Sequence, residues 1–308
     1  MKYLVIGGAG FIGHNLVLKL LNRGHSVRVF DRKIHSESYL PACDYVVGNF
    51  SKIENHQTIF HNIDIVYHLI STTLPKSSNE NPVFDVQTNV VSSINLLKMC
   101  CHANVKKIIF TSSGGTVYGI PKTIPITEEH PLNPICSYGI TKLAIEKYLS
   151  LFHHLYGLDY QVLRLSNPFG PFQDPFLQQG VIAVFLGKIL RNQPIEIWGD
   201  GTICRDYIYI DDAAEALYLS SLKSTKSKII NIGTGKGTTL TEVLAMMAKV
   251  LNKNMKINYK NVRNVDVPVN VLDIQRAFTE LNWAPAITME QGIRMTCDWL
   301  TKNLSGLT

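Results

Sequence analysis

The segment that most restricts what this chain can fold into is GGAGFIG, which places Gly7, Gly10 and Gly13 three residues apart. It follows KYLVI, a short apolar run that predicts a buried strand, and precedes a stretch with helical apolar spacing that stops at Gly24. Glycines at such a junction permit a tight turn and let backbone approach a pyrophosphate at the helix N-terminus. The segment therefore predicts a dinucleotide site at a strand-to-helix turn.

A carboxylate ends the next predicted strand, SVRVFD. Asp31 at that position can accept hydrogen bonds from the adenosine ribose hydroxyls, and its charge repels a 2′-phosphate. Arg32 acts in the opposite direction, because an arginine can hold such a phosphate. The pair favours NAD as the cofactor without excluding NADP.

Predicted strands and helices alternate through the first half of the chain, and one long helix is expected over residues 83–101, with Val86 and Val90 on one apolar face. This alternation is typical of an α/β fold, a Rossmann-type doubly wound parallel sheet. It breaks after Arg164, at the proline-rich NPFGPFQDPF. We expect residues 1–167 to form the dinucleotide-binding domain and residues 168–308 a smaller mixed α/β substrate-binding lobe, with segments that could return to the main sheet.

The composition fits a globular protein that acts on a small anionic molecule. Of 308 residues, 45% are hydrophobic and 18% charged, and the net charge of +6 is not concentrated in a basic run, so nothing points to nucleic acid. The six cysteines form no Cys-x-x-Cys and the histidines show no metal spacing, which predicts reduced thiols and no metal site. No apolar run is long enough for a membrane span, and the N-terminal run is broken by glycines. A cytoplasmic protein is expected.

The segment SYGITK places Tyr138 and Lys142 four residues apart, on one face of a predicted helix that ends at Gly157. An ammonium near a phenol favours the phenolate, which would make the tyrosine a base near neutral pH. Alone, such a pair is common on solvated helices. Beside a dinucleotide site it predicts removal of a proton from an alcohol.

With GGAGFIG and SYGITK in one chain, the sequence resembles the extended short-chain dehydrogenase/reductase superfamily, and within it the NAD-dependent sugar-nucleotide epimerases of the UDP-glucose 4-epimerase type. The matching segments include DIVYHL, TSSGGTVYG, NPICSYGITKLAIEKY, LRLSNPFGP, IEIWGDGTICRDYIYIDDAAEA, NIGTGKGTTLTEV and LNWAPAITMEQGI. The resemblance implies NAD as cofactor, UDP-sugars as substrates and epimerisation at C4 through a transient 4-keto intermediate. It also implies a homodimer with a four-helix interface, formed by the helices around residues 83–97 and 137–149.

The same resemblance implies individual roles. Tyr138 is the expected acid/base, Lys142 holds the nicotinamide ribose, and Ser113 binds the reacting sugar oxygen. Cofactor contacts are expected at Gly7, Gly10, Phe11, Ile12, Gly13, Asp31, Arg32, Asn49, Phe50, Leu69, Ile70, Asn89, Tyr138 and Lys142. Substrate contacts are expected at Ser113 and Tyr138, at the phosphate-binding Asn167, Arg205 and Arg263, and at Asp266 near the nucleotide.

Some positions depart from the family pattern and leave alternatives open. TSSGGTVYG has one residue more than the common form, so the catalytic hydroxyl could belong to Ser113 or to Thr116. Gly114 and Gly115 stand where related dehydratases and decarboxylases carry acids, which argues against both reactions. A 4-ketoreductase would consume NADPH, which Asp31 disfavours. A sensor that binds NAD without catalysis remains the alternative from another class.

Other departures concern the substrate. Asn49 replaces the aspartate usual in the adenine-side motif, and Ser166 replaces an aromatic residue often found before the asparagine. By counting from Arg263, Asn270 takes the position thought to limit room for a 2-acetamido group. Asparagine is smaller than the tyrosine of glucose-restricted forms, so an N-acetylated sugar is a candidate substrate. Which sugar and which nucleotide are bound stays open, a uronic acid included.

Overall fold

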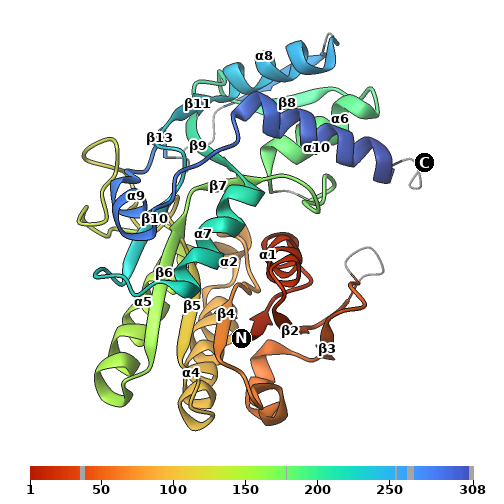
Figure 1. Cartoon of the computed structure of the whole chain (residues 1–308). Helices are drawn as coiled ribbons and strands as arrows, with labels where there is room; N and C mark the ends of the chain where they lie inside the picture. Colours follow the sequence, from red (N-terminus) through yellow and green to blue (C-terminus); the bar gives the residue numbers. More distant parts are fainter. Residues whose placement is uncertain (35–38, 178, 254, 262–266, 305–308) are drawn as a thin grey trace.

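Seven parallel strands form the larger sheet of the molecule (Figure 1). The computed structural model describes residues 1–34, 39–177, 179–253, 255–261 and 267–304. In spatial order the strands are β10 (Ile229–Ile232), β6 (Asp159–Leu165), β5 (Lys107–Ser113), β4 (Ile65–His68), β1 (Lys2–Ile6), β2 (Ser26–Asp31) and β3 (Asp44–Val47). Every neighbouring pair runs parallel. The strand order reverses between β1 and β4, the switch point at which such sheets bind ligands.

Helices cover both faces of this sheet, as predicted for a doubly wound fold. Along β1, Tyr3 and Val5 point to one apolar core and Leu4 and Ile6 to the other. The first core is closed by α1 (Phe11–Asn22) and α7 (Ile210–Leu222). The second is closed by the 3₁₀ helices η2 (Phe50–Asn55) and η3 (Gln57–Phe60) together with α4 (Ser92–His102) and α5 (Ser137–Tyr156). The predicted α/β Rossmann-type fold is therefore confirmed.

The expected long helix over residues 83–101 is not uniform. It consists of a short α3 (Pro82–Asp85), a π-helical segment η4 (Val86–Val91) and then α4. The wider π turn changes which side chains share a face. Val90 is buried, but Val86 is 43% exposed, so the prediction of one apolar face through both residues is wrong.

In the described part of the chain, the smaller lobe is built from short mixed strands and the helices around them. Its sheets contain β7 (Asn167–Phe169), β9 (Cys204–Tyr209), β11 (Gly237–Thr239) and β13 (Val269–Asn270), and separately β8 (Ile195–Trp198) with β12 (Ile257–Lys260). Its helices are α6 (Val181–Leu190), α8 (Leu240–Leu251) and α10 (Met289–Leu304) (Figure 1). From the same half of the chain, β10 joins the large sheet, and α9 (Gln275–Leu281) lies near it. The boundary at residue 167 stays a prediction.

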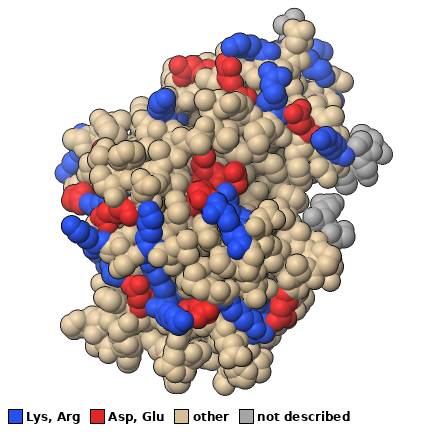
Figure 2. All heavy atoms as spheres, viewed as in Figure 1, with Lys and Arg blue, Asp and Glu red and all other residues tan. Residues whose placement is uncertain are grey.

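The surface carries charges of both signs. Figure 2 shows basic and acidic side chains interspersed over one face, without an extended field of a single sign. Within the described ranges, no helix combines the length and the hydropathy that crossing a bilayer requires.

Candidate active site

The glycine turn between β1 and α1 has the shape of a dinucleotide cradle. Gly7 adopts a φ of +86°, a conformation that residues with a Cβ rarely adopt. A Cβ on Gly13 would lie 2.1 Å from the carbonyl oxygen of Gly7, so helix and turn touch at this glycine. Gly10 is the N-cap residue directly before α1, and its backbone is extended. It has room around it, since a Cβ at this position would meet no atom closer than 3.5 Å. The first backbone amides of α1 have no carbonyl within the helix to bond, so with the open position at Gly10 they suit a diphosphate.

Asp31 lies beside this turn, at the carboxyl end of β2. Its carboxylate accepts hydrogen bonds from the backbone amides of Ala9 (3.1 Å) and Arg32 (2.8 Å). Burial raises the pKa of Asp31, and these two amide hydrogen bonds act against that rise. The contact with Ala9 joins the acid to the glycine turn, so a dinucleotide on the N-terminus of α1 would extend toward Asp31. The side chain of Arg32 is exposed at the rim.

The adenine-side residues lie directly after β3. Asn49 is exposed, and its side-chain oxygen accepts the backbone amide of Ser51, which caps η2. Phe50 is buried, with its ring 5.2 Å from the ring of His68. Any contact of Phe50 with a cofactor would therefore involve its backbone, whereas the Asn49 side chain lies at the surface.

The segment after β4 forms the other wall of the glycine turn. A Cβ on Gly7 would lie 3.0 Å from the backbone nitrogen of Ile70, so the two segments touch. Leu69 and Ile70 are partly buried, as are Phe11 and Ile12 at the start of α1. The structure thus brings these four predicted residues to the border of the cradle.

Asn89 fixes the backbone that follows Ile70. Its side-chain oxygen accepts the amide of Thr72 (3.0 Å), and its nitrogen donates to the Thr72 hydroxyl (2.8 Å) and to Asp85 (2.9 Å). Asn89 is 3% exposed. Its hydrogen bonds hold the segment that follows β4, and its contact with a cofactor stays a prediction.

Tyr138 and Lys142 lie on one face of α5, close to the carboxyl end of β5. The Lys142 ammonium is buried and donates to the carbonyl oxygen of Thr111 at 2.9 Å. It lies 5.6 Å from the ring centroid of Tyr138 and 4.6 Å from that of Phe110. The α2 helix (Pro75–Glu80) orients this turn, since the Tyr138 amide donates to the Ser78 hydroxyl at 2.9 Å.

The protein's own groups disfavour the phenolate form of Tyr138. Burial, with smaller contributions from Cys136 and Asp85, raises its pKa to about 12, and a hydrogen bond with Ser71 acts in the opposite direction. The expectation that Lys142 brings this pKa toward neutrality is thus not met by the side chains alone, because desolvation dominates. The sequence alone does not reveal Ser71 as a partner of Tyr138. The available indication is its place in HLIS, directly after Leu69 and Ile70, which are predicted to contact the cofactor.

Lys142 responds to the same low-polarity surroundings. Burial lowers the pKa of its ammonium to about 8, with Asp85 and Glu146 opposing the fall. Lys142 therefore remains mainly charged at neutral pH, and the ammonium is the form that donates the stronger hydrogen bond to a ribose hydroxyl.

The segment after β5 lies against the first turn of α5. A Cβ on Gly139 would lie 2.8 Å from the carbonyl oxygen of Thr116, so the segment and the helix touch beside Tyr138. Ser113 ends β5, and the Thr116 hydroxyl is buried without a hydrogen-bond partner in the described part of the chain. Both hydroxyls therefore stay candidates for binding the reacting oxygen. Gly114 and Gly115, between them, carry no acid.

The substrate-side residues lie in the smaller lobe. Asn167 begins β7 and donates to the carbonyl oxygen of Asp206 at 3.0 Å. Arg205 lies on β9, and its guanidinium donates to the Cys204 carbonyl at 2.9 Å. Because β7 pairs with β9, the structure brings Asn167 and Arg205 to one small sheet. Two further predicted residues, Arg263 and Asp266, lie outside the described residues.

Asn270 joins this lobe to the segment after β5. It pairs with Arg205 in the register of β13 and β9, and its side-chain nitrogen donates to the Gly114 carbonyl at 3.1 Å. Asn270 is 1% exposed, and its side-chain oxygen has no hydrogen-bond partner among the described residues. The residue that the sequence associates with substrate size therefore contacts the neighbour of Ser113.

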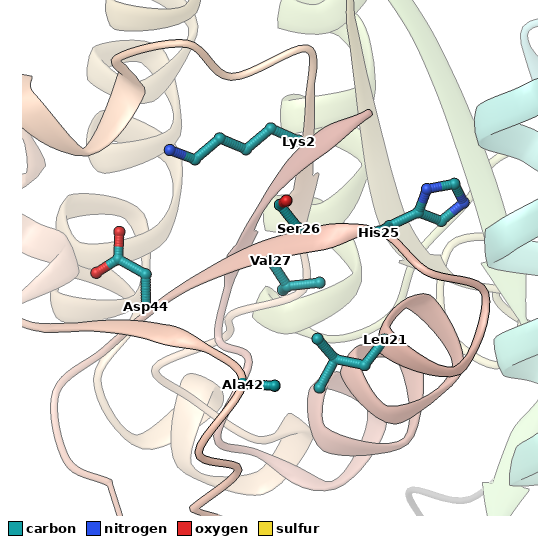
Figure 3. A pocket seen from close by; sticks show the side chains of 7 residues that line it. All are labelled: Lys2, Leu21, His25, Ser26, Val27, Ala42 and Asp44. Atoms are coloured by element: carbon teal, nitrogen blue, oxygen red, sulfur yellow. The ribbon is translucent and has the colours of Figure 1, made fainter.

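A pocket lies elsewhere, at the amino ends of β1 and β2 (Figure 3). Ligands of parallel α/β sheets bind at the carboxyl ends of the strands, where Gly7 and Asp31 lie. The residues that line the pocket are Lys2, Leu21, His25, Ser26, Val27, Ala42 and Asp44. None of the predicted site residues is among them, so the pocket is not a candidate for the active site.

Comparison with known proteins places these features in a family context. The model of the NAD-dependent epimerase/dehydratase family matches residues 3–233. A UDP-glucose 4-epimerase of Thermotoga maritima, solved with UDP-glucose, has a TM-score of 0.95 and 36% identity, covering 99% of this chain and 100% of that one. A UDP-glucose 4-epimerase of Thermus thermophilus, solved with NAD, has a TM-score of 0.92 and 33% identity, covering 98% and 100%. The dTDP-4-dehydro-6-deoxyglucose reductase of Escherichia coli is 36% identical and covers 94% of each chain.

Proposed function

Because this chain belongs to the NAD-dependent epimerase/dehydratase family, we propose that it is an NAD-dependent epimerase that interconverts UDP-sugars at C4. The observation that carries the proposal is the arrangement at the end of β5. Tyr138 and the buried Lys142 share one helix face beside a hydroxyl-bearing segment, and Gly114 and Gly115 in that segment bring no acid. Similarity to UDP-glucose 4-epimerases over the whole chain supports the substrate class.

The proposed chemistry starts with a proton transfer at C4. Tyr138 takes the proton of the C4 hydroxyl, whose oxygen is held by Ser113 or Thr116, as the C4 hydride leaves the sugar. Bound NAD supplies the hydride acceptor and a positive ring that favours the phenolate over the phenol. Lys142 holds the nicotinamide ribose through its ammonium.

Epimerisation also requires the sugar to turn while its nucleotide stays bound. Asn167, Arg205 and Arg263 would hold the diphosphate, since guanidinium groups bind phosphates through paired hydrogen bonds. The 4-keto sugar then rotates about its link to the diphosphate and receives the hydride on its other face, with Tyr138 returning the proton. No second substrate is consumed.

A 4-ketoreductase is the second candidate, because the Escherichia coli reductase is as similar as the Thermotoga epimerase. The acid at the end of β2 argues against NADPH, the usual donor of hydride in reductions. A dehydratase or decarboxylase is disfavoured by Gly114 and Gly115, and a sensor without catalysis by the presence of Tyr138 with Lys142.

The proposal is tested by incubating the protein with a panel of UDP-sugars without added reductant and separating the products. Interconversion of a pair of 4-epimers supports it. Accumulation of a 4-keto sugar or of a pentose would indicate a dehydratase or a decarboxylase, and turnover only with added NADPH would indicate a reductase.

For the choice of sugar we propose that N-acetylated hexosamines are accepted beside glucose and galactose. Asn270 is smaller than tyrosine and contacts Gly114 next to the predicted catalytic Ser113. Substituting Asn270→Tyr should abolish turnover of UDP-N-acetylglucosamine and spare UDP-glucose. If the wild-type protein turns over UDP-glucose alone, the proposal about the sugar is wrong while the proposed reaction stands.

We further propose a homodimer formed by the helices on the α4–α5 side. The large apolar side chains exposed on these and the adjoining segments include Val83, Phe84, Val86, Val91, Ile140, Leu151, Leu155 and Tyr156. The helices that carry them pack on one another, and apolar side chains exposed together on neighbouring elements are typical of interaction sites. A Val91→Glu, Ile140→Glu double variant should be monomeric by light scattering, whereas a variant that remains dimeric would place the interface elsewhere.

We propose that the protein acts in the cytoplasm with reduced thiols. The six cysteines, which all lie in described ranges, stand as free thiols rather than disulfides. Titration of the purified protein with a thiol reagent under denaturing, non-reducing conditions should count six thiols. A lower count would point to an oxidising compartment.

A further inference from the structure

Asp85 is a buried carboxylate at the end of α3 to which the proposed reaction assigns no task. It is fully buried. Its two oxygens accept four side-chain hydrogen bonds, from the Thr73 hydroxyl (2.5 Å), the Asn89 amide (2.9 Å), the Ser137 hydroxyl (2.8 Å) and the Thr141 hydroxyl (2.7 Å). The first two donors belong to the wall of the cofactor cradle, and the last two flank Tyr138 on α5.

Asp85 differs in its charge balance from the other buried acid of this region. Glu146 forms a buried ion pair with Arg164 at 2.6 Å. Asp85 has no Lys or Arg nitrogen within 4.0 Å in the described ranges, and Lys142 is the buried cation with which its charge interacts. A buried charge without a counter-charge is costly. The attraction between Asp85 and Lys142 across the first turn of α5 therefore favours the charged form of each group.

We propose that Asp85 is a positioning residue, which fixes the turn that carries Tyr138 against the cofactor cradle and balances the buried charge of Lys142. The inference rests on the proposed function for the roles of Tyr138 and Lys142. The proposed role of Asp85 has two parts. The hydrogen bonds from Ser137 and Thr141 hold the turn on both sides of Tyr138, and the negative charge acts on the two titrating groups.

The charge of Asp85 acts on both groups in the same sense. It helps to keep Lys142 protonated against desolvation, and it adds to the burial that raises the pKa of Tyr138. The other titratable groups that face Lys142 are Tyr138 and Glu146 from α5 and His68 from β4. Glu146 is already paired, and burial holds the pKa of His68 well below its usual range, so it is neutral. Removing the charge of Asp85 should therefore lower the pKa of Lys142 and that of Tyr138 together.

The test is Asp85→Asn, which removes the charge and keeps an oxygen and a nitrogen to which rotatable hydroxyls can bond. The binding of NAD to the cofactor-free protein is measured by calorimetry across pH. Wild-type affinity should fall as the pH rises through the pKa of Lys142, and in the variant that fall should occur about one pH unit lower. In a plot of turnover rate against pH, we assign the rising limb to deprotonation of Tyr138 and the falling limb to deprotonation of Lys142. Both limbs should move to lower pH in the variant.

Thr141→Val is the matched control, because it removes one hydrogen bond to Asp85 and leaves the charge. It should reduce turnover severalfold without moving either limb. The inference is overturned if Asp85→Asn weakens NAD binding equally at every pH, or if Thr141→Val moves the limbs as far as Asp85→Asn does.

A stability measurement keeps the inference testable if Asp85→Asn folds poorly. The double variant Asp85→Asn, Lys142→Met contains neither buried charge, so it should unfold at a higher urea concentration than either single variant. If the effects of the two single substitutions on the free energy of unfolding simply add in the double variant, Asp85 does not balance the charge of Lys142. The binding and unfolding measurements need no turnover, so they test Asp85 even if no UDP-sugar proves to be a substrate.

Discussion

Substituting Gly13→Ala is expected to lower the stability of the cofactor-free protein by about 2 kcal/mol. The new Cβ would lie 2.1 Å from the Gly7 carbonyl oxygen and 2.7 Å from the Cα of Gly8, where real Cβ contacts are not closer than 3.0 Å. Helix α1 must therefore move by roughly an ångström from the turn, and overpacking of this kind costs about 1–3 kcal/mol or more. The better helix propensity of alanine offsets up to about 1 kcal/mol of that cost.

The matched control lies in the same turn. Gly10 has extended backbone at a φ of −80°, and a Cβ there would meet its nearest atom at 3.5 Å, an ordinary contact. Gly10→Ala should therefore leave the free energy of unfolding within about 0.5 kcal/mol of the wild-type value. It should nevertheless weaken NAD binding by a factor of ten or more, since the methyl group enters the space where the diphosphate approaches the backbone.

The assay is urea unfolding of cofactor-free protein, followed by circular dichroism, together with calorimetric titration of NAD. Gly13→Ala should lose both stability and NAD affinity, whereas Gly10→Ala should lose affinity alone. The reasoning is refuted if Gly13→Ala is as stable as the wild type, or if Gly10→Ala binds NAD normally.

Three further predictions concern the other side of the site. Tyr138→Phe should keep the fold and NAD affinity and reduce turnover by about 10²–10⁴-fold, and an unaffected rate would remove Tyr138 from the mechanism. Glu146→Gln should lower the free energy of unfolding in urea by about 3–5 kcal/mol, because it leaves the fully buried Arg164 without its counter-charge; a change below about 1 kcal/mol would contradict this. Because the pKa of Lys142 is about 8, its ammonium is lost as the pH rises through that value. NAD affinity should therefore decline above pH 8, and a constant affinity to pH 10 would exclude a contribution of the Lys142 ammonium to NAD binding.

The features that the sequence predicted correctly depend on neighbours along the chain. The turn at Gly7 and Gly13 lies between a strand and a helix that the local apolar pattern reveals, and Asp31 ends the next strand. Tyr138 and Lys142 share a helix face because they are four residues apart. Such local relations are sufficient to predict the parallel sheet and to place these residues at its carboxyl edge.

What the sequence did not reveal depends on contacts between distant segments. Asp85 meets Ser137 and Thr141 only in the folded chain, and the π-helical segment that follows Asp85 turned Val86 outward. A cation four residues away predicts a lowered pKa for Tyr138, but burial is the stronger effect and raises it. Burial cannot be read from a spacing, since it is set by every element packed around the group.

The central claim is that one carbon of the sugar gives up a hydride and receives it back. It is tested most directly with UDP-glucose deuterated at C4, incubated with the protein and no added reductant. We expect UDP-galactose that retains the deuterium at C4, because the hydride returns to the carbon from which it came. Loss of the deuterium to solvent, accumulation of a 4-keto sugar or the absence of any epimer would contradict it.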